Sequence, residues 1–115
     1  MSRVRFGVAR HRRRKKVLKK AKGYWGARHA LFKSAKETVI RAEAYATRDR
    51  RNRKREMRRL WITRISAACR ARDISYSRFM HGLSKAEVQL NRKELSELAI
   101  RNPEAFDQLV ATARG

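Results

Sequence analysis

The side chains best suited to chemistry in this sequence are basic, and they gather between residues 48 and 59. This stretch, RDRRNRKREMRR, carries eight arginines or lysines in twelve positions. Placed on a helix at 100° per residue, the eight side chains cover about 240° of the circumference. Asp49, Asn52 and Glu56 occupy the remaining strip. Since Lys and Arg bind phosphate oxygens, this pattern predicts a rod that passes between several nucleic-acid segments.

Residue spacings typical of catalysis or metal binding are missing from the sequence. His11, His29 and His81 stand far apart, and Ser66 has no histidine nearby. Cys69 is the only cysteine, which excludes an internal disulfide and a multi-cysteine zinc site. The acidic residues are scattered, and there is no Gly-rich phosphate loop. We therefore predict no enzyme, no catalytic residue, no metal, no cofactor and no small-molecule substrate.

The overall charge predicts a polyanionic partner. The 115 residues include 32 Lys and Arg against 10 Asp and Glu, for a formal net charge of +22. Self-repulsion on this scale disfavours a compact free state, and clustered Lys and Arg favour nucleic acid as the partner. No apolar run approaches the ~18–20 residues that span a bilayer. The start of the chain lacks the apolar region of a secretory signal, and the single cysteine fits a reducing cytosol.

The charge divides the chain into two regions. Residues 1–59 hold 23 basic and 4 acidic residues, whereas residues 60–115 hold 9 and 6. We predict a basic arm over 1–59 and a small globular helical domain over 60–115. The domain would share the end of the arm's long helix.

Glycine and proline positions predict the elements of the arm. We expect a short basic helix over residues 10–22 and a bend at 23–26. After Gly26 neither residue type recurs until Gly82. Because good helix formers fill that gap, we expect a long helix over 27–72.

Capping signals predict the helices of the second region. Ser75 would cap a short helix that ends near Gly82. Residues 84–87 and 91–94 both have capping-box spacing. Residues 102–104 place an asparagine cap, an N1 proline and a first-turn acid in order. No strand pattern competes. The predicted fold is all-α, with a long basic N-terminal helical extension followed by a small C-terminal helical domain.

Apolar residues beyond position 59 supply a candidate core. Met57, Trp61, Ile65 and Ala68 follow helical spacing, so the last turns of the long helix should join this core. The candidate core residues are Leu60, Trp61, Ile65, Ala68, Ile74, Phe79, Leu83, Val88, Leu90, Leu95, Leu98, Phe106, Leu109 and Val110.

The bend carries two adjacent aromatic residues, Tyr24 and Trp25. Either ring could stack on an unpaired base, which is worth about 1–3 kcal/mol per base. Either ring could instead pack on the neighbouring helix and hold the bend. Both interpretations stay open for each residue.

Several blocks of the sequence resemble a known family. RRRKKVLKKAKGYWGAR, YATRDRRNRKREMRRLWITRISAACR, YSRFMHGLSKAEVQLNRKELSELA and NPEAF are similar to the bacterial-type large-subunit ribosomal protein L-twenty family. The resemblance covers almost the whole chain. It implies a helical C-terminal domain on the outside of the large subunit and an N-terminal extension that enters the large rRNA. It also implies an early role in subunit assembly.

The resemblance and the basic pattern together predict the rRNA-binding residues. In the arm they are Arg3, Arg5, Arg10, Arg12, Arg13, Arg14, Lys15, Lys16, Lys19, Lys20, Lys22, Tyr24, Trp25, Arg28, Arg48, Arg50, Arg51, Arg53, Lys54, Arg55, Arg58 and Arg59. In the globular domain they are Tyr76, Ser77, Lys85, Arg92 and Lys93. The expected partners are large-subunit rRNA and neighbouring large-subunit proteins, with one copy in each ribosomal particle. The expected location is the cytoplasm, or an organelle that encodes its own copy.

Three other functions compete with this hypothesis. The main alternative is an architectural DNA-binding protein, although such proteins usually lay one basic helix in a groove. A small basic nuclease and a membrane-active basic protein are the others. We also predict that residues 1 to about 55 are largely disordered without RNA, while the C-terminal region stays folded.

Overall fold

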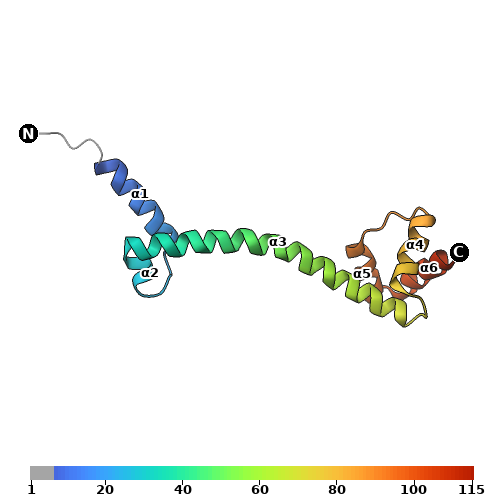
Figure 1. Ribbon diagram of the computed structural model, residues 1–115. Coiled ribbons are helices and arrows are strands. Elements are labelled where there is room, and N and C mark those ends of the chain that lie inside the picture. Colours follow the sequence, from blue (N-terminus) through green and yellow to red (C-terminus); the bar gives the residue numbers. More distant parts are fainter. Residues whose placement is uncertain (1–6) are drawn as a thin grey trace, which may run out of the picture. The chain divides into compact units, whose positions relative to one another are not determined.

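The computed structural model describes residues 7–115, which form helices joined by turns (Figure 1). The helices are α1 (Gly7–Lys20), α2 (Ala27–Ala30), α3 (Phe32–Arg70), α4 (Tyr76–Lys85), α5 (Arg92–Arg101) and α6 (Pro103–Arg114). No strand occurs within residues 7–115, and the all-α prediction is confirmed. The chain divides into two compact units, the first ending at Arg51 and the second running from Asn52 to Gly115. The division of function after Arg59 stays a prediction.

The predicted bend is present between α1 and α2. Gly23 has φ 87° and Gly26 has φ 58°, the left-handed region that glycine enters without a Cβ penalty. The short basic helix is also present, although α1 covers Gly7–Lys20 where residues 10–22 were expected.

The prediction of one helix over residues 27–72 is wrong at both ends. Leu31 is extended, with φ −94° and ψ 125°, and separates α2 from α3. Its N–H donates to the Ala27 carbonyl at 2.9 Å, and its carbonyl accepts from the Ala35 N–H at 2.8 Å. Both backbone groups of Leu31 are therefore satisfied, so the break leaves none of them unpaired. At the other end α3 stops at Arg70, and Asp73 adopts φ 54°.

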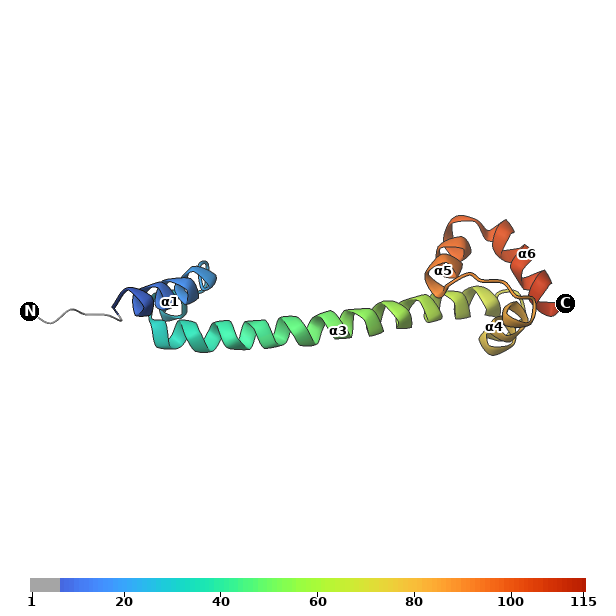
Figure 2. The same cartoon turned by 90° about the horizontal axis from the view of Figure 1, so that it is seen from above.

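The second unit has the larger hydrophobic core. Its buried residues come from the end of α3, the following turn and α4, α5 and α6, namely Ile65, Cys69, Ile74, Phe79, Leu83, Leu95, Phe106 and Val110. The ring centroids of Phe79 and Phe106 lie 5.1 Å apart, and the ring planes are tilted by 35°. The separation lies within the range that interacting aromatic rings prefer. Figure 2 shows α4, α5 and α6 gathered at the end of α3. Cys69 contributes a small, fully buried side chain to this core.

Several predicted core residues lie outside this core. Met57, Leu60 and Leu90 are exposed at 39%, 40% and 36%. Trp61 is half-buried but is not packed against the core cluster, and the same holds for Leu98. For the residues of α3 the physical reason is that, in the second unit, the first fully buried side chain of this helix is Ile65.

Three of the predicted helix caps form as expected. The Ser75 side chain accepts from the Arg78 N–H at 3.4 Å, and Asn102 accepts from the Ala105 N–H at 3.1 Å. Asn91 and Glu94 form a complete capping box, with both hydrogen bonds at 2.9 Å. These side chains satisfy backbone donors that the first turn of a helix leaves free.

The other predicted cap, over residues 84–87, is wrong. Helix α4 continues past Gly82 to Lys85, so Ser84 belongs to its last turn. Glu87 then turns the chain with φ 56°, and the Val88 N–H donates back to the Leu83 carbonyl at 3.0 Å. Gly82 does not end the helix. It lies where α4 meets the backbone of Ala113 in α6.

The first unit has a small core of its own. Ala21, Ala35 and Val39 are buried, and Val17, Leu18 and Tyr24 pack against them. Figure 1 shows the last turns of α1 meeting the beginning of α3, while the first turns of α1 point away from it. This packing positions the cations of α1 relative to those at the start of α3.

Candidate nucleic-acid interface

The basic side chains of residues 48–59 form one continuous feature on α3. We call the eight of them the basic band: Arg48, Arg50, Arg51, Arg53, Lys54, Arg55, Arg58 and Arg59. All eight are exposed. Twelve helical residues extend about 18 Å. Helix α3 carries all eight residues, three of them in the first unit and five in the second.

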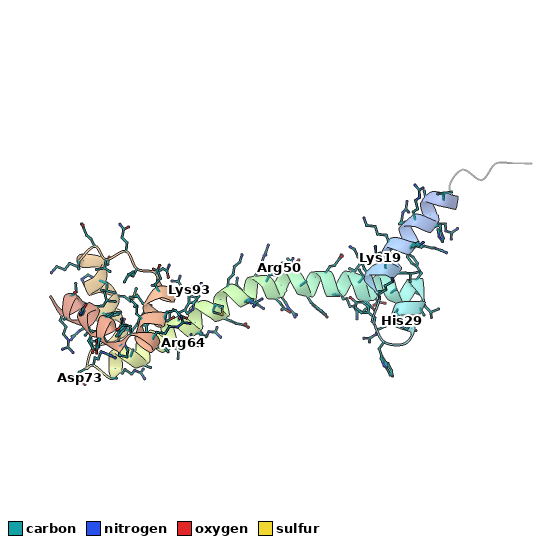
Figure 3. All side chains as sticks on the ribbon, turned by 180° about the vertical axis from the view of Figure 1, so that it is seen from behind. Lys19, His29, Arg50, Arg64, Asp73 and Lys93 are labelled. Atoms are coloured by element: carbon teal, nitrogen blue, oxygen red, sulfur yellow. The ribbon has the colours of Figure 1, made fainter. Side chains whose placement is uncertain are left out.

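Most cations of the basic band form no ion pair within residues 7–115. Among the described residues, only Arg48 of the band has an ion pair, from its Nε to Asp49 Oδ1 at 2.9 Å. That hydrogen bond raises the pKa of Arg48 above its ordinary value. The Arg48 guanidinium also lies over the Tyr45 ring, 4.7 Å from the centroid. Arg50 donates to Thr47 Oγ1 at 3.2 Å, and Figure 3 shows its side chain on α3.

The cations of α1 divide into two groups. Lys20 pairs with Glu43 at 2.5 Å, and the Arg14 guanidinium lies 5.3 Å from the centroid of the Phe32 ring. These two cations connect α1 to α3. The remaining predicted cations of α1 and the following turn are exposed, namely Arg10, Arg12, Arg13, Lys15, Lys16, Lys19 and Lys22. The predicted site residues Arg3 and Arg5 lie outside the described residues.

The two aromatic residues of the bend have different surroundings. Tyr24 packs against the small core of the first unit, whereas Trp25 is 92% exposed. The His29 Nδ1 lies 2.7 Å from the Tyr24 carbonyl oxygen. A carbonyl only accepts, so the His29 Nδ1–H is the donor. Tyr24 therefore holds the bend, while Trp25 remains free to contact a partner.

The predicted patch on the C-terminal domain contains one direct contact. The Arg92 Nε donates to the Tyr76 hydroxyl oxygen at 2.9 Å, which brings α5 and α4 together. Both side chains are partly buried. Ser77, Lys85 and Lys93 are exposed, and Figure 3 shows Lys93 on α5. The hydrogen bond holds the Arg92 guanidinium against Tyr76.

A known protein family matches most of the chain. The family described as ribosomal protein L20 matches residues 3–109 of the chain. The chain belongs to the ribosomal protein L20 family. Every residue predicted to bind rRNA, from Arg3 to Lys93, falls within the matched range.

Individual relatives of the L20 family are similar over almost their full length. A protein named large ribosomal subunit protein bL20 from Staphylococcus epidermidis is 56% identical over 114 residues, which cover 99% of this chain and 97% of the relative. The protein of the same name from a Thermoanaerobacter species is 56% identical over 99% of this chain and 96% of its own. That from Oceanobacillus iheyensis is 55% identical, with shares of 99% and 97%.

The structure also shows a feature of this L20-family chain that sequence reasoning missed. A hollow of about 380 Å³ lies along α3, lined by Arg28, Ser34, Glu37, Thr38, Arg41, Ala42 and Tyr45. The small side chains of Ser34, Thr38 and Ala42 recur every four residues, so they share one face of the helix and leave space above it. This spacing is the sequence pattern that could have predicted the hollow. Arg41 and Glu37 pair across the hollow's edge at 2.8 Å.

Neither a metal site nor a membrane span is found in the part of this L20-family chain that the structure describes. Residues 7–115 bring together no group of three His, Cys, Asp or Glu side chains able to hold a metal ion. None of the helices within that range is both long and apolar enough to cross a bilayer.

Proposed function

We propose that this protein is a structural, non-enzymatic constituent of the large ribosomal subunit that binds large-subunit rRNA directly. Membership of the L20 family supports this, because the relatives are named as large-subunit proteins. In this proposal one copy occupies each particle, beside other large-subunit proteins. The protein is located with the ribosome, in the cytoplasm or in an organelle that makes its own ribosomes.

The basic band is the observation that carries the proposal. Its like-charged side chains at i, i+4, such as Arg51 and Arg55 or Lys54 and Arg58, disfavour the isolated helix by about 0.2–0.5 kcal/mol per pair. Within the described residues, Arg48 is the only member of the band that has an anionic partner. Phosphates from several RNA segments would supply the missing negative charge and release their counterions. The band would thereby lower the repulsion that opposes close packing of these segments early in assembly.

In this proposal the C-terminal domain supplies recognition of a structured RNA site. Its patch is Tyr76, Ser77, Lys85, Arg92 and Lys93. The hydrogen bond between Arg92 and Tyr76 fixes one guanidinium, which lowers the entropy lost when that group meets a phosphate or a base edge. The domain anchors the protein while the arm neutralises phosphates.

Salt-dependent binding of the intact chain to large-subunit rRNA tests the role of the basic band. The test variant replaces Arg53, Lys54 and Arg55 with alanine. Each lost phosphate contact lowers the slope of log affinity against log salt by about 0.7–0.9, so the slope should fall by about 2. The matched control replaces the exposed residues Arg70, Arg78 and Arg101, which removes the same charge outside the predicted interface. An equal fall in both variants would mean that net charge alone drives binding.

The alternative of an architectural DNA-binding protein is tested by competition at matched salt. The proposal expects structured large-subunit rRNA to displace duplex DNA of equal length. A preference for duplex DNA would contradict it.

A further inference from the structure

Trp25 is the most exposed large apolar side chain in the described part of the protein. It is 92% exposed, whereas the next, Val8, is 63% exposed. An indole has a large apolar surface, and leaving it in water forgoes the favourable free energy that burial of a large apolar side chain gives. The small core of the first unit lies next to it in sequence and takes Tyr24 instead. The exposure of Trp25 therefore calls for a partner outside the chain.

The backbone that carries Trp25 is held on both sides. The Tyr24 N–H donates to the Ala21 carbonyl at 3.1 Å, and the Arg28 N–H donates to the Trp25 carbonyl at 3.3 Å. His29 holds the Tyr24 carbonyl through its ring at 2.7 Å. These bonds and the packed Tyr24 ring define the turn that carries the indole in the folded arm.

The charge around Trp25 selects the class of partner. Lys22 and Arg28 are exposed on either side of it in the chain, and Lys19 is exposed on the last turn of α1. A ligand that meets these cations is expected to be anionic along its length. A nucleic-acid strand meets that requirement and also carries flat π faces that stack on indole rings. In a duplex those faces are already covered, so the available face belongs to an unpaired base.

We propose that Trp25 stacks on an unpaired nucleobase of the bound RNA, with Tyr24 acting as the residue that positions it. This inference rests on the proposed function and assigns one base contact within an interface otherwise made to phosphates. Lys22 and Arg28 then contact the phosphates that flank the stacked nucleotide. Stacking of this kind depends little on which base is present.

Affinity and fluorescence measured on the same protein test the proposal. The sequence has two tryptophans, so Trp61→Phe leaves Trp25 as the only indole. Transcribed large-subunit rRNA should quench this fluorescence, whereas a fully paired RNA duplex should not. Trp25→Ala should weaken binding to the rRNA about 5- to 150-fold with the salt slope unchanged. Trp25→Phe should recover most of the loss, because the ring still stacks.

The control variant is Lys22→Ala, which should remove one phosphate contact. Its affinity should fall, and the slope of log affinity against log salt should decrease by about 0.7–0.9. Unchanged affinity in Trp25→Ala would overturn the stacking proposal, and so would a change in slope as large as that of Lys22→Ala. Quenching that requires added ribosomal proteins would also overturn it in favour of a protein contact. The basic-band variant separates these results from failure of the proposed function, because its slope does not depend on Trp25.

Discussion

The Arg72 guanidinium lies over the Phe106 ring, 5.0 Å from its centroid, and thereby joins the turn after α3 to the first turn of α6. The same side chain donates to the Ala68 carbonyl at 3.0 Å and forms an ion pair with Asp107. Only 22% of the Arg72 side chain is exposed. Arg72 therefore stabilises the C-terminal domain and, unlike the basic band, is largely unavailable to RNA.

We predict that Arg72→Ala lowers the free energy of unfolding of this domain by about 1–3 kcal/mol, from the lost cation–π contact and hydrogen bonds. Urea denaturation followed by circular dichroism measures the change. Arg101→Ala is the matched control, since its ion pair with Glu97 is largely exposed and should be worth less than about 1 kcal/mol. Equal losses in the two variants would contradict this role of Arg72.

Gly82→Ala is predicted to destabilise the contact between α4 and α6. A Cβ at position 82 would collide with the backbone of Ala113, which cannot rotate away as a side chain can. Overpacking of this kind costs about 1–3 kcal/mol, and occasionally more. Ser84→Ala, at an exposed position of the same helix, is the control and should change stability little. Thermal unfolding compares the two, and a Gly82→Ala protein as stable as the parent would show that the helices separate easily.

Gly82 also shows why part of the fold could not be predicted from sequence. Glycine commonly ends helices, and only the position of α6 reveals that this one is needed for close packing. Similarly, no glycine or proline near Leu31 predicts a break in the helix. In the structure the backbone hydrogen bonds of Leu31 are all satisfied. The caps at Ser75, Asn91 and Asn102 were predictable because capping depends on residues close in sequence.

Part of the candidate site could likewise be predicted from the sequence, and part could not. The basic band could be predicted, since helical periodicity alone determines how its side chains spread. The roles of Tyr24 and Trp25 could not, because the two residues are adjacent and of one chemical type. Only the packing of α1 on α3 partly buries the Tyr24 ring and leaves Trp25 exposed.

We predict that the Cys69 thiol makes the free energy of unfolding fall at alkaline pH. Burial raises the pKa of its thiol from 9.0 to about 11, against a smaller lowering by Arg72. The folded state therefore keeps a proton that the unfolded state releases, so this contribution is present below pH 9 and is lost as pH rises toward 11. Its upper size is about 3 kcal/mol, at 1.36 kcal/mol per pKa unit. Urea denaturation at pH 8 and pH 10.5 should show a steeper loss in the parent than in Cys69→Ala, and equal losses would contradict the shift.

Amide hydrogen exchange should separate the arm from the C-terminal domain when RNA is absent. Among residues 7–51, only Ala21, Ala35 and Val39 are buried fully or nearly so, and the like charges of the basic band repel one another. We expect fast exchange up to about residue 55 and protection beyond about residue 57, because local opening is easiest where few apolar contacts are buried. Bound rRNA should extend the protection into the arm. Uniform protection of the free protein would show that the arm folds without RNA.

Site-specific photo-crosslinking within intact large ribosomal subunits tests the central claim most directly. The crosslinker replaces Arg53, Lys54 or Arg55 one at a time, positions that point about 100° apart around α3. We predict crosslinks to large-subunit rRNA from all three positions, because phosphates should surround most of the helix. Crosslinks to RNA from only one position, or to proteins from all three, would contradict the account.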